Sequence, residues 1–257
     1  MKIMHLGMVS TGTVIVLGLA MVVPAFTQHG PDRSIPSVML SFVILDNASA
    51  SWCTGLSSIL ENHGVRGTVF VSGKTAQANP ECVTSFSSDV DIGSQTYSYV
   101  DLTSISDYTK AFEEVKRGKE AVDRVGNIDS RLFRAPYGLT DENIYSLASR
   151  SGITADFSYN NRYNKYEDNQ FVRYEIKALS GDSEGLRLFS FVSIDDDVVR
   201  LLLPVPIAIV FDSDMQLEDV NAFISKLKSG YGDSVRFVNA SDLVGMDLTI
   251  RKGVQSL

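Results

Sequence analysis

The sequence predicts an α/β fold built on a parallel β-sheet. Short, nearly continuous apolar runs, which suit strands covered on both faces, alternate along the chain with segments of helical spacing. The chain has 257 residues, of which 44% are hydrophobic, and this is enough material for one sizeable core. Alternation of this extent fits a barrel as well as an open sheet.

Residues 6–26 predict a membrane-targeting helix. They contain no charged side chain, follow Lys2, and are long enough to cross a hydrocarbon layer, which takes about 20 apolar residues. Both an uncleaved signal anchor and a signal peptide fit residues 1–28, because the sequence around Phe26 is a poor cleavage site. Since Lys2 favours the cytoplasmic side, we expect the rest of the chain to be membrane-anchored outside the cytoplasm, or secreted.

One domain follows this segment. Residues 29–37 contain Gly30 and Pro36 and predict a linker, so the domain is expected over residues 38–257. Within it, Gly64 is a helix stop, and Ser or Asp caps open the long central helix. Residues 159–168 are polar and aromatic and predict a loop. Strands are predicted at residues 38–45, 67–72, 90–93, 131–133, 154–157 and 207–211, and helices at residues 54–62, 106–125, 141–151 and 219–229.

The charge and cysteine content narrow the classes of function. A net charge of −8 and a pI near 4.9, with no clustered Lys or Arg, argue against binding of nucleic acid or anionic lipid. The two cysteines, Cys53 and Cys82, both lie in the part expected to be exported, where an oxidising compartment permits a disulfide. Two buried thiols that pack as small hydrophobic groups are the alternative.

Four short motifs occur in order along the domain. The first strand ends in Asp46 and Asn47, and the helix after it leads into HGVRGTVFV at residues 63–71. The second motif is IGSQTYSYVDLTSIS at residues 92–106, the third is FRAPYG at residues 133–138, and the last is IAIVFD at residues 207–212. Together they resemble the polysaccharide deacetylase family of the NodB-homology type.

The resemblance implies both a fold and a chemistry. Polysaccharide deacetylases fold as a distorted, incomplete (β/α) barrel and remove acetyl groups from chitin-like, peptidoglycan or related glycans. In this family an aspartate and two histidines hold a divalent metal, and a further histidine acts as catalytic acid. The chain has Asn47, Gln95 and Tyr99 at the three metal positions and Phe211 at the acid position.

These replacements remove the groups that would bind the metal. A divalent metal serves amide hydrolysis by lowering the pKa of its bound water and polarising the carbonyl group. An amide oxygen is an uncharged, weak ligand, and a phenol with a pKa of about 10 is mostly protonated at neutral pH. The domain contains one histidine, His63, so no other alignment supplies two. We therefore expect no cofactor, and a divalent metal only if the site has a non-standard arrangement.

Other functional positions of the family are retained. By the resemblance, Asp46 is the general base, Arg134 orients it through a charge-assisted hydrogen bond, and Tyr137 offers its backbone N–H to an acetyl oxygen. Asp156 is expected where relatives tune the acid. A purely structural ion pair between Asp46 and Arg134 is the alternative interpretation.

Two further groups of residues have less specific patterns. A set of tyrosines predicts an aromatic rim that could stack on sugar rings, although plain packing explains such residues equally well; it comprises Tyr97, Tyr99, Tyr159, Tyr163 and Tyr166. A set of aspartates could form a Ca²⁺ site, but solvated loop charges are the simpler interpretation; it comprises residues 195–197, Asp212 and Asp214.

Three functions fit these observations. The leading hypothesis is an exported, catalytically silent deacetylase fold that binds an acetylated glycan or a protein partner at the cell envelope, with the membrane contacted through the N-terminal segment. The second is an active hydrolase that uses a non-standard metal site or Asp46 directly. The third is a structural scaffold in which Tyr99 and Phe211 fill the cleft.

Overall fold

The computed structural model describes residues 37–158, 172–183, 186–193, 207–244 and 249–252. The chain divides into two compact units, Met1–Asp32 and Arg33–Leu257, and every described residue belongs to the second unit. The predicted membrane segment at residues 6–26 and the loop at residues 159–168 lie outside the described residues. Within the described ranges, no helix is both long enough and apolar enough to cross a membrane.

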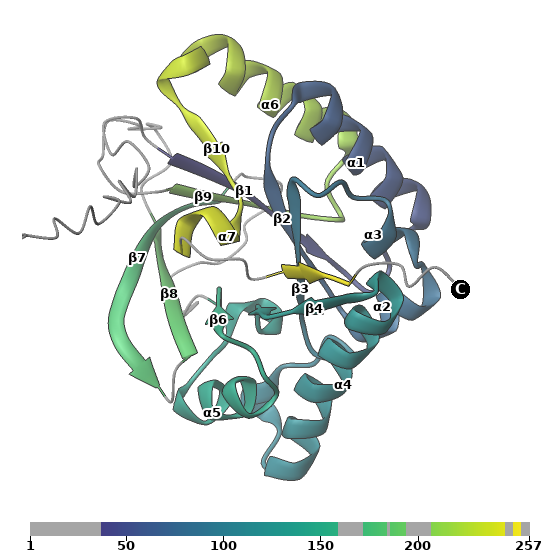
Figure 1. The fold of residues 1–257 in the computed structure, drawn as a ribbon, viewed down its shortest axis with the longest axis vertical. Coiled ribbons are helices and arrows are strands. Elements are labelled where there is room, and N and C mark those ends of the chain that lie inside the picture. The colour runs from purple at the N-terminus through teal and green to yellow at the C-terminus, as the bar shows by residue number, and fades with distance from the viewer. Residues whose placement is uncertain (1–36, 159–171, 184–185, 194–206, 245–248, 253–257) are drawn as a thin grey trace, which may run out of the picture. The chain divides into compact units, whose positions relative to one another are not determined.

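The predicted α/β fold with a mainly parallel sheet is confirmed (Figure 1). In the described part of the chain, hydrogen-bonded strands follow the order β10-β1-β2-β3-β5-β6-β8-β7-β9, and β4 and β11 form a separate pair. The strands are β1 (Ser37–Ile44), β2 (Gly67–Val71), β3 (Val90–Ser94), β4 (Ile128–Ser130), β5 (Leu132–Phe133), β6 (Ala155–Asp156), β7 (Val172–Ser183), β8 (Leu186–Ser193), β9 (Ile207–Asp212), β10 (Arg236–Val238) and β11 (Thr249–Arg251).

The sheet curls back on itself through β1. This strand pairs in parallel with β2, β9 and β10, with Ser41 opposite Thr68 and Val43 opposite Asp212. The far end of the strand order, β9, is therefore a direct neighbour of β1. The curl is irregular because β7 runs antiparallel to both of its neighbours, β8 and β9. The result is a distorted barrel-like sheet of α/β type.

Most of the helices lie on the side of this sheet away from β7 and β8 (Figure 1). Polar side chains begin several of them: the Ser49 hydroxyl accepts the N–H of Trp52, and the Asp107 carboxylate accepts the N–H of Thr109. The α-helices are α1 (Ala50–His63), α2 (Gly73–Ala78), α3 (Glu81–Thr84), α4 (Tyr108–Gly126), α5 (Glu142–Arg150), α6 (Leu217–Tyr231) and α7 (Ala240–Val244), and the 3₁₀ helices are η1 (Leu102–Ser104), η2 (Pro136–Gly138) and η3 (Gly232–Ser234).

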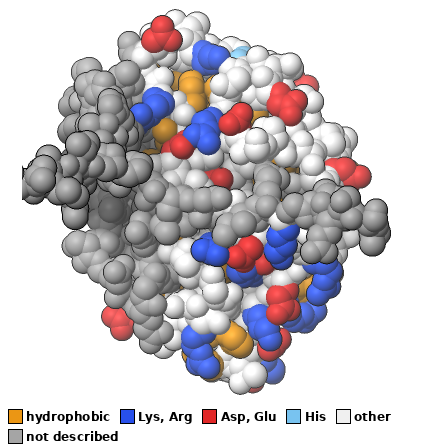
Figure 2. Space-filling view, in the orientation of Figure 1, with side chains coloured by type: hydrophobic (Ala, Val, Ile, Leu, Met, Phe, Trp, Pro, Cys, Tyr) orange, Lys and Arg blue, Asp and Glu red, His pale blue; other side chains and the backbone are white. Residues whose placement is uncertain are grey.

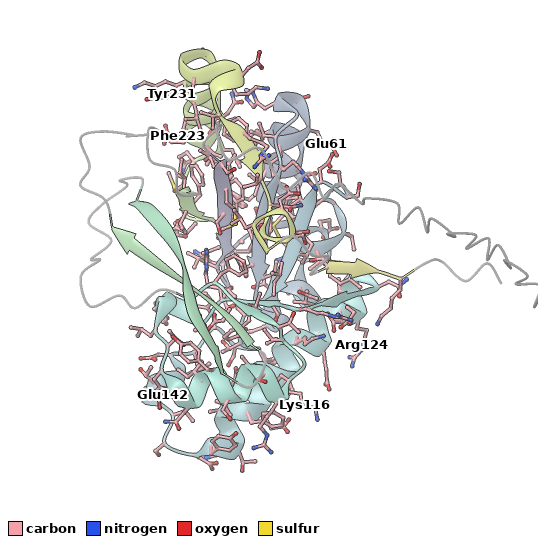
Figure 3. The ribbon with its side chains drawn as sticks, turned by 60° about the vertical axis from the view of Figure 1, so that its left-hand side comes forward. Glu61, Lys116, Arg124, Glu142, Phe223 and Tyr231 are labelled. Atoms are coloured by element: carbon pink, nitrogen blue, oxygen red, sulfur yellow. A yellow bond between two sulfur atoms is a disulfide. The ribbon has the colours of Figure 1, made fainter. Side chains whose placement is uncertain are left out.

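The long helix α4 shows a solvent face and a buried face. Lys116 and Arg124 project away from the sheet, whereas Val115 and Val122 are fully buried (Figure 3). On the face drawn in Figure 2, Lys and Arg side chains are interspersed with Asp and Glu side chains. Mixed charges of this kind produce no large field of one sign.

The core lies on both faces of the sheet. Along β1, alternate residues such as Leu40 and Phe42 pack against α1 and α6, whereas Met39 and Val43 face the inside of the curl. All eight residues of β1 are buried. This two-sided burial explains why the strand appears in the sequence as a continuous apolar run.

Most predicted elements are confirmed, with small shifts at their ends. The first helix begins at Ala50, four residues before the predicted start, because the Ser49 cap lies ahead of the apolar positions used to recognise it. The elements not predicted are the short segments α2, α3, β4, β10, α7 and β11, the 3₁₀ helices η1, η2 and η3, and the antiparallel pair β7 and β8. Strands of three residues leave too few positions for a periodic pattern.

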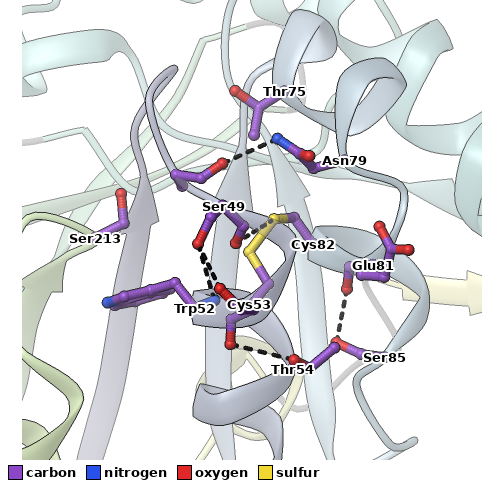
Figure 4. The surroundings of a disulfide bond; sticks show 12 residues. Ser49, Trp52, Cys53, Thr54, Thr75, Asn79, Glu81, Cys82, Ser85 and Ser213 are labelled. Atoms are coloured by element: carbon purple, nitrogen blue, oxygen red, sulfur yellow. Dashed lines mark hydrogen bonds between the residues drawn. A yellow bond between two sulfur atoms is a disulfide. The ribbon is translucent and has the colours of Figure 1, made fainter.

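Cys53 and Cys82 form a disulfide, which decides between the two alternatives left by the sequence (Figure 4). Their Cα atoms are 4.9 Å apart, and the bond joins α1 to α3. Around it, the Asn79 amide donates to the carbonyl oxygen of Ala48 at 2.9 Å. The bridge closes a loop with a sequence separation of 29 residues.

We expect the Cys53→Ala, Cys82→Ala double variant to lose about 3.5 kcal/mol of unfolding free energy, because a bridge across a loop of this length restricts the unfolded chain by that amount. Urea unfolding of the oxidised protein and the double variant measures the difference. Reduction of the native protein should shift its midpoint in the same direction. An unchanged midpoint under reducing conditions contradicts the expectation.

The loop after β3 is clamped by a close approach of α4. A Cβ atom added at Gly118 would lie 2.1 Å from the carbonyl oxygen of Gln95, and the Tyr97 N–H donates to the carbonyl oxygen of Glu114 at 2.8 Å. Only a glycine permits this distance between helix and loop. The position of the loop therefore depends on Gly118.

Gly118→Ala is expected to destabilise the protein by about 2–3 kcal/mol, because the methyl group has to displace backbone atoms. Gly230→Ala in α6 is the matched control: a Cβ there meets nothing within 4 Å, so helix propensity should leave stability unchanged or raise it by up to about 1 kcal/mol. Thermal or urea unfolding of both variants tests this, and equal effects would show that α4 and the loop tolerate the added methyl group.

Candidate functional site

A pocket of about 420 Å³ lies at the carboxyl ends of the strands β1, β3, β5 and β9. Ligands of parallel α/β sheets commonly bind at this end of the strands, and the volume lies in the range of small-molecule sites. The pocket is lined by Val43, Leu45, Asp46, Asn47, Gln95, Tyr99, Arg134, Ala135, Tyr137, Gly138 and Asp212. The structure thus brings together seven polar or aromatic positions from strands far apart in the sequence.

Asp46 follows β1 and is exposed in this pocket. One of its carboxylate oxygens accepts hydrogen bonds from the hydroxyl groups of Ser72, at 2.7 Å, and Thr75, at 3.3 Å. In the described part of the chain, Asp46 makes no ion pair with Arg134 or with any other cation. The predicted charge-assisted bond between Asp46 and Arg134 is therefore wrong, because hydroxyl groups at the start of α2 hold the carboxylate instead.

Arg134 is almost completely buried, with 1% of its surface exposed. Its Nε donates to the carbonyl oxygen of Phe157 at 3.0 Å, and its Cζ lies 4.4 Å from the centroid of the Phe70 ring. These contacts hold the guanidinium group on the inner wall of the pocket. Stacking on an aromatic face is a common way for proteins to place a buried arginine.

Asp156 lies at the end of β6, behind Arg134, and does not line the pocket. One carboxylate oxygen accepts the N–H of Ser158 at 2.8 Å and its hydroxyl group; the other has no hydrogen-bond partner. Burial raises the pKa of Asp156 to about 6, although the bonds from Ser158 and the charge of Arg134 oppose the shift.

Asn47 and Gln95, which the sequence resemblance aligns with two of the family's metal positions, both carry uncharged amides. The Asn47 amide donates to the carboxylate of Asp214 at 2.9 Å. Gln95 is fully buried, and neither its side-chain nitrogen nor its side-chain oxygen has a hydrogen-bond partner. Buried polar atoms without partners are rare in proteins, since each costs about 1–3 kcal/mol.

Tyr99 and Tyr137 form an aromatic pair at the pocket. Their ring centroids are 5.2 Å apart in an edge-to-face arrangement, and Tyr137 is 50% exposed. Both have positive backbone φ angles, 55° for Tyr99 and 59° for Tyr137. Side chains of this size rarely adopt that conformation, and such strain concentrates at functional sites.

The structure places Tyr97 elsewhere. Its ring lies beneath the guanidinium of Arg117, 4.0 Å from the ring centroid, and its hydroxyl donates to the Gln77 side chain at 3.0 Å. It lines a second pocket of about 190 Å³ between α2 and α4. The expectation that Tyr97 forms one rim with Tyr99 is therefore not met, because the clamped loop directs the two rings to different pockets. Tyr159, Tyr163, Tyr166 and the aspartates at residues 195–197 lie outside the described residues.

Phe211 does not face the pocket. Its ring stacks on Phe42, with centroids 5.1 Å apart, and meets Phe223 of α6 edge to face at 5.6 Å. The prediction that Phe211 occupies the acid position and fills the cleft is wrong, because alternation along β9 turns this side chain toward the helices. The next residue, Asp212, lines the pocket. Burial raises the pKa of Asp212, whose carboxylate accepts the N–H of Asp214 at 3.1 Å.

The donor atoms in this pocket do not fit the metal site of the family. Within the described ranges, no group of three His, Cys, Asp or Glu side chains is placed to hold a metal ion. The pocket offers two carboxylates, two amides and two phenols, and no imidazole. Catalytic zinc sites use three His, Asp, Glu or Cys ligands, so Asn47, Gln95 and Tyr99 are a poor substitute.

Comparison with solved structures identifies the fold. A Mycobacterium smegmatis protein provisionally assigned as a polysaccharide deacetylase matches with a TM-score of 0.61 and 15% identity, over 88% of this chain and 96% of that one. Peptidoglycan deacetylase PdaC from Bacillus subtilis matches with a TM-score of 0.57 and 14% identity, over 83% and 92%. A CE4 family pseudoenzyme from Bacillus anthracis matches with a TM-score of 0.56 and 14% identity, over 84% and 67%.

The sequence itself matches a family model. Residues 31–155 align with the model described as Polysaccharide deacetylase. This range contains three of the four motifs and most of the pocket, including Asp46, Gln95 and Arg134. The solved structures agree on the fold. Over residues 31–155 the chain is therefore similar to the polysaccharide deacetylase family, and its fold is that of the solved structures.

Proposed function

We propose that this domain binds an acetylated amino-sugar glycan in the 420 Å³ pocket, outside the cytoplasm, and does not hydrolyse it. The observation that carries the proposal is the donor set. By the sequence resemblance, neutral Asn47, Gln95 and Tyr99 take the family's metal positions, and within the described residues no group of three His, Cys, Asp or Glu side chains is placed to hold a metal ion. If no metal activates a water molecule, Asp46 has no nucleophile from which to remove a proton.

The shape and lining of the pocket support a sugar ligand. The Tyr99 and Tyr137 rings present an apolar surface, and Tyr137 is half exposed, so a sugar ring can stack on it. Asp46, Gln95 and Asp212 add polar groups that can orient hydroxyl groups. An open pocket also counts against the scaffold alternative, which requires Phe211 in the cleft.

Two features support a location outside the cytoplasm. The disulfide between Cys53 and Cys82 is typical of oxidising compartments. Residues 6–26 have the composition of a signal peptide or anchor. Both agree with a partner at the cell envelope, where acetylated glycans occur.

We expect the full-length protein, purified in detergent, to bind no stoichiometric Zn²⁺ and to release no acetate from N-acetylglucosamine oligomers, while it binds them measurably. Metal analysis after incubation with Zn²⁺ or Co²⁺, an acetate assay and calorimetry test the three parts. Tyr137→Ala should weaken binding about tenfold through loss of the exposed ring. Stoichiometric metal together with acetate release lost in Asp46→Asn would overturn the proposal in favour of an active hydrolase.

Restoring the family's ligands should restore metal binding. The Asn47→Asp, Gln95→His, Tyr99→His triple variant supplies a carboxylate and two imidazoles, a set that suits Zn²⁺. Histidine also tolerates the positive φ angle of residue 99 better than most side chains do. Zinc titration of the triple variant should show one bound ion, whereas Gln95→His alone should not. If the triple variant and Gln95→His bind zinc equally, the side chains at positions 47, 95 and 99 do not meet around one ion.

Asp156 is expected to make stability depend on pH. Because its folded pKa, about 6, exceeds its ordinary value of 3.8, the folded state binds the extra proton between these values. This contribution to the free energy of unfolding is roughly 3 kcal/mol. It is fully present below about pH 4 and is lost as the pH rises through 6. Urea unfolding at several pH values should therefore show the wild type losing stability relative to Asp156→Asn. If the stabilities of the wild type and of Asp156→Asn change equally with pH, the pKa of Asp156 is not raised.

A further inference from the structure

We infer that the sugar unit held in this pocket is one that carries a free primary amine, within a polymer whose other units remain acetylated. The inference rests on the proposed glycan binding and names the unit that is selected. It follows from the charges of Asp46 and Asp212 and from the unpartnered amide of Gln95, which together line the pocket.

The pocket carries two carboxylates, those of Asp46 and Asp212, against one guanidinium group, that of Arg134. In the described part of the chain, neither Asp46 nor Asp212 forms an ion pair with a Lys or Arg side chain. Arg134 also lines the pocket, but its guanidinium is fixed by Phe157 and Phe70, and its charge acts on the buried Asp156. Two carboxylates thus remain for a ligand, and a cation is the group that they favour.

Gln95 adds an acceptor and a donor that a ligand has to satisfy. Its amide is fully buried, lines the pocket, and has no partner on either atom. A primary ammonium carries three N–H donors, so it can serve carboxylate and amide oxygens together. The Gln95 amide nitrogen can then donate to a sugar hydroxyl. A trans acetamide points its N–H and C=O in opposite directions and cannot satisfy both atoms of Gln95 at once.

The apolar wall of the pocket favours the acetylated sugar unit instead. Val43, Leu45 and Ala135 could receive the methyl of an acetyl group, and burial of one such carbon is worth about fourfold in affinity. A hydrogen bond to a charged group is worth about ten- to a hundredfold. The hydrogen bond between the ammonium group and a carboxylate therefore adds more affinity than burial of the methyl group, even after some screening by solvent at the exposed Asp46.

Calorimetry on the full-length protein in detergent tests the inference, with glucosamine and N-acetylglucosamine tetramers as ligands at about pH 6. The amine form should bind about tenfold more tightly, and its advantage should shrink at about pH 9, where amines lose their proton. Because the protein has a net charge of −8, non-specific attraction of a polycation has to be excluded. Repeating the titration at high salt does this in part.

Matched variants complete the control. Asp212→Asn removes one pocket charge and should abolish most of the preference for the amine, because the amide that replaces the carboxylate carries no charge. Asp233→Asn, on an exposed site of η3 outside the pocket, changes the net charge equally and should keep the preference. Gln95→Met should weaken amine binding yet stabilise the free protein, because it removes a buried amide that has no hydrogen-bond partners. If Gln95 had only a structural role, this variant would instead be less stable than the wild type.

The outcomes separate this inference from the proposed function. Equal or tighter binding of the acetylated tetramer overturns the inference and leaves glycan binding intact. A preference for the amine that survives in both Asp46→Asn and Asp212→Asn also overturns it, since the pocket charges would then play no part. Failure of the protein to bind either tetramer overturns the inference together with the proposed function.

Discussion

The burial of strand β1 on both faces is the constraint on which the rest of this domain depends. Leu40 and Phe42 pack toward the helices and Val43 toward the inside of the curl, so a shift by one residue would reverse every contact. The strand also has three parallel neighbours, β2, β9 and β10. Once its register is set, Asp46 after β1 and Asp212 at the end of β9 necessarily open into the same pocket.

The loop after β3 contributes the remaining geometry of the site. Because Gly118 allows α4 to touch the loop backbone, three nearby side chains leave it in different directions. Gln95 is buried against the pocket, Tyr97 lies beneath Arg117, and Tyr99 reaches the ring of Tyr137. The positive φ of Tyr99 is part of this arrangement. Packing of α4 therefore stabilises a conformation that the loop would not adopt alone.

Much of the fold could be predicted from the sequence, because two-sided burial leaves continuous apolar runs such as β1 and β2. The site was only partly predictable. Alternation in β9 already groups Ile209 with Phe211 on one face, so the strand pattern could have shown that Asp212, not Phe211, faces the pocket. The direction of Tyr97 could not be predicted, since it depends on a helix–loop distance that no local pattern records.

The charge balance of the pocket explains how three neutral residues could change its chemistry, as the proposed function requires. In the family a dication offsets nearby carboxylates, whereas amides and a phenol in its place contribute no charge. The carboxylates of Asp46 and Asp212 remain, and their attachment to strand ends keeps them in position. Arg134 cannot compensate for both, because its contacts hold it beside the buried Asp156. Under the proposed function, the scaffold thus stays the same while the pocket attracts cations in place of activating water.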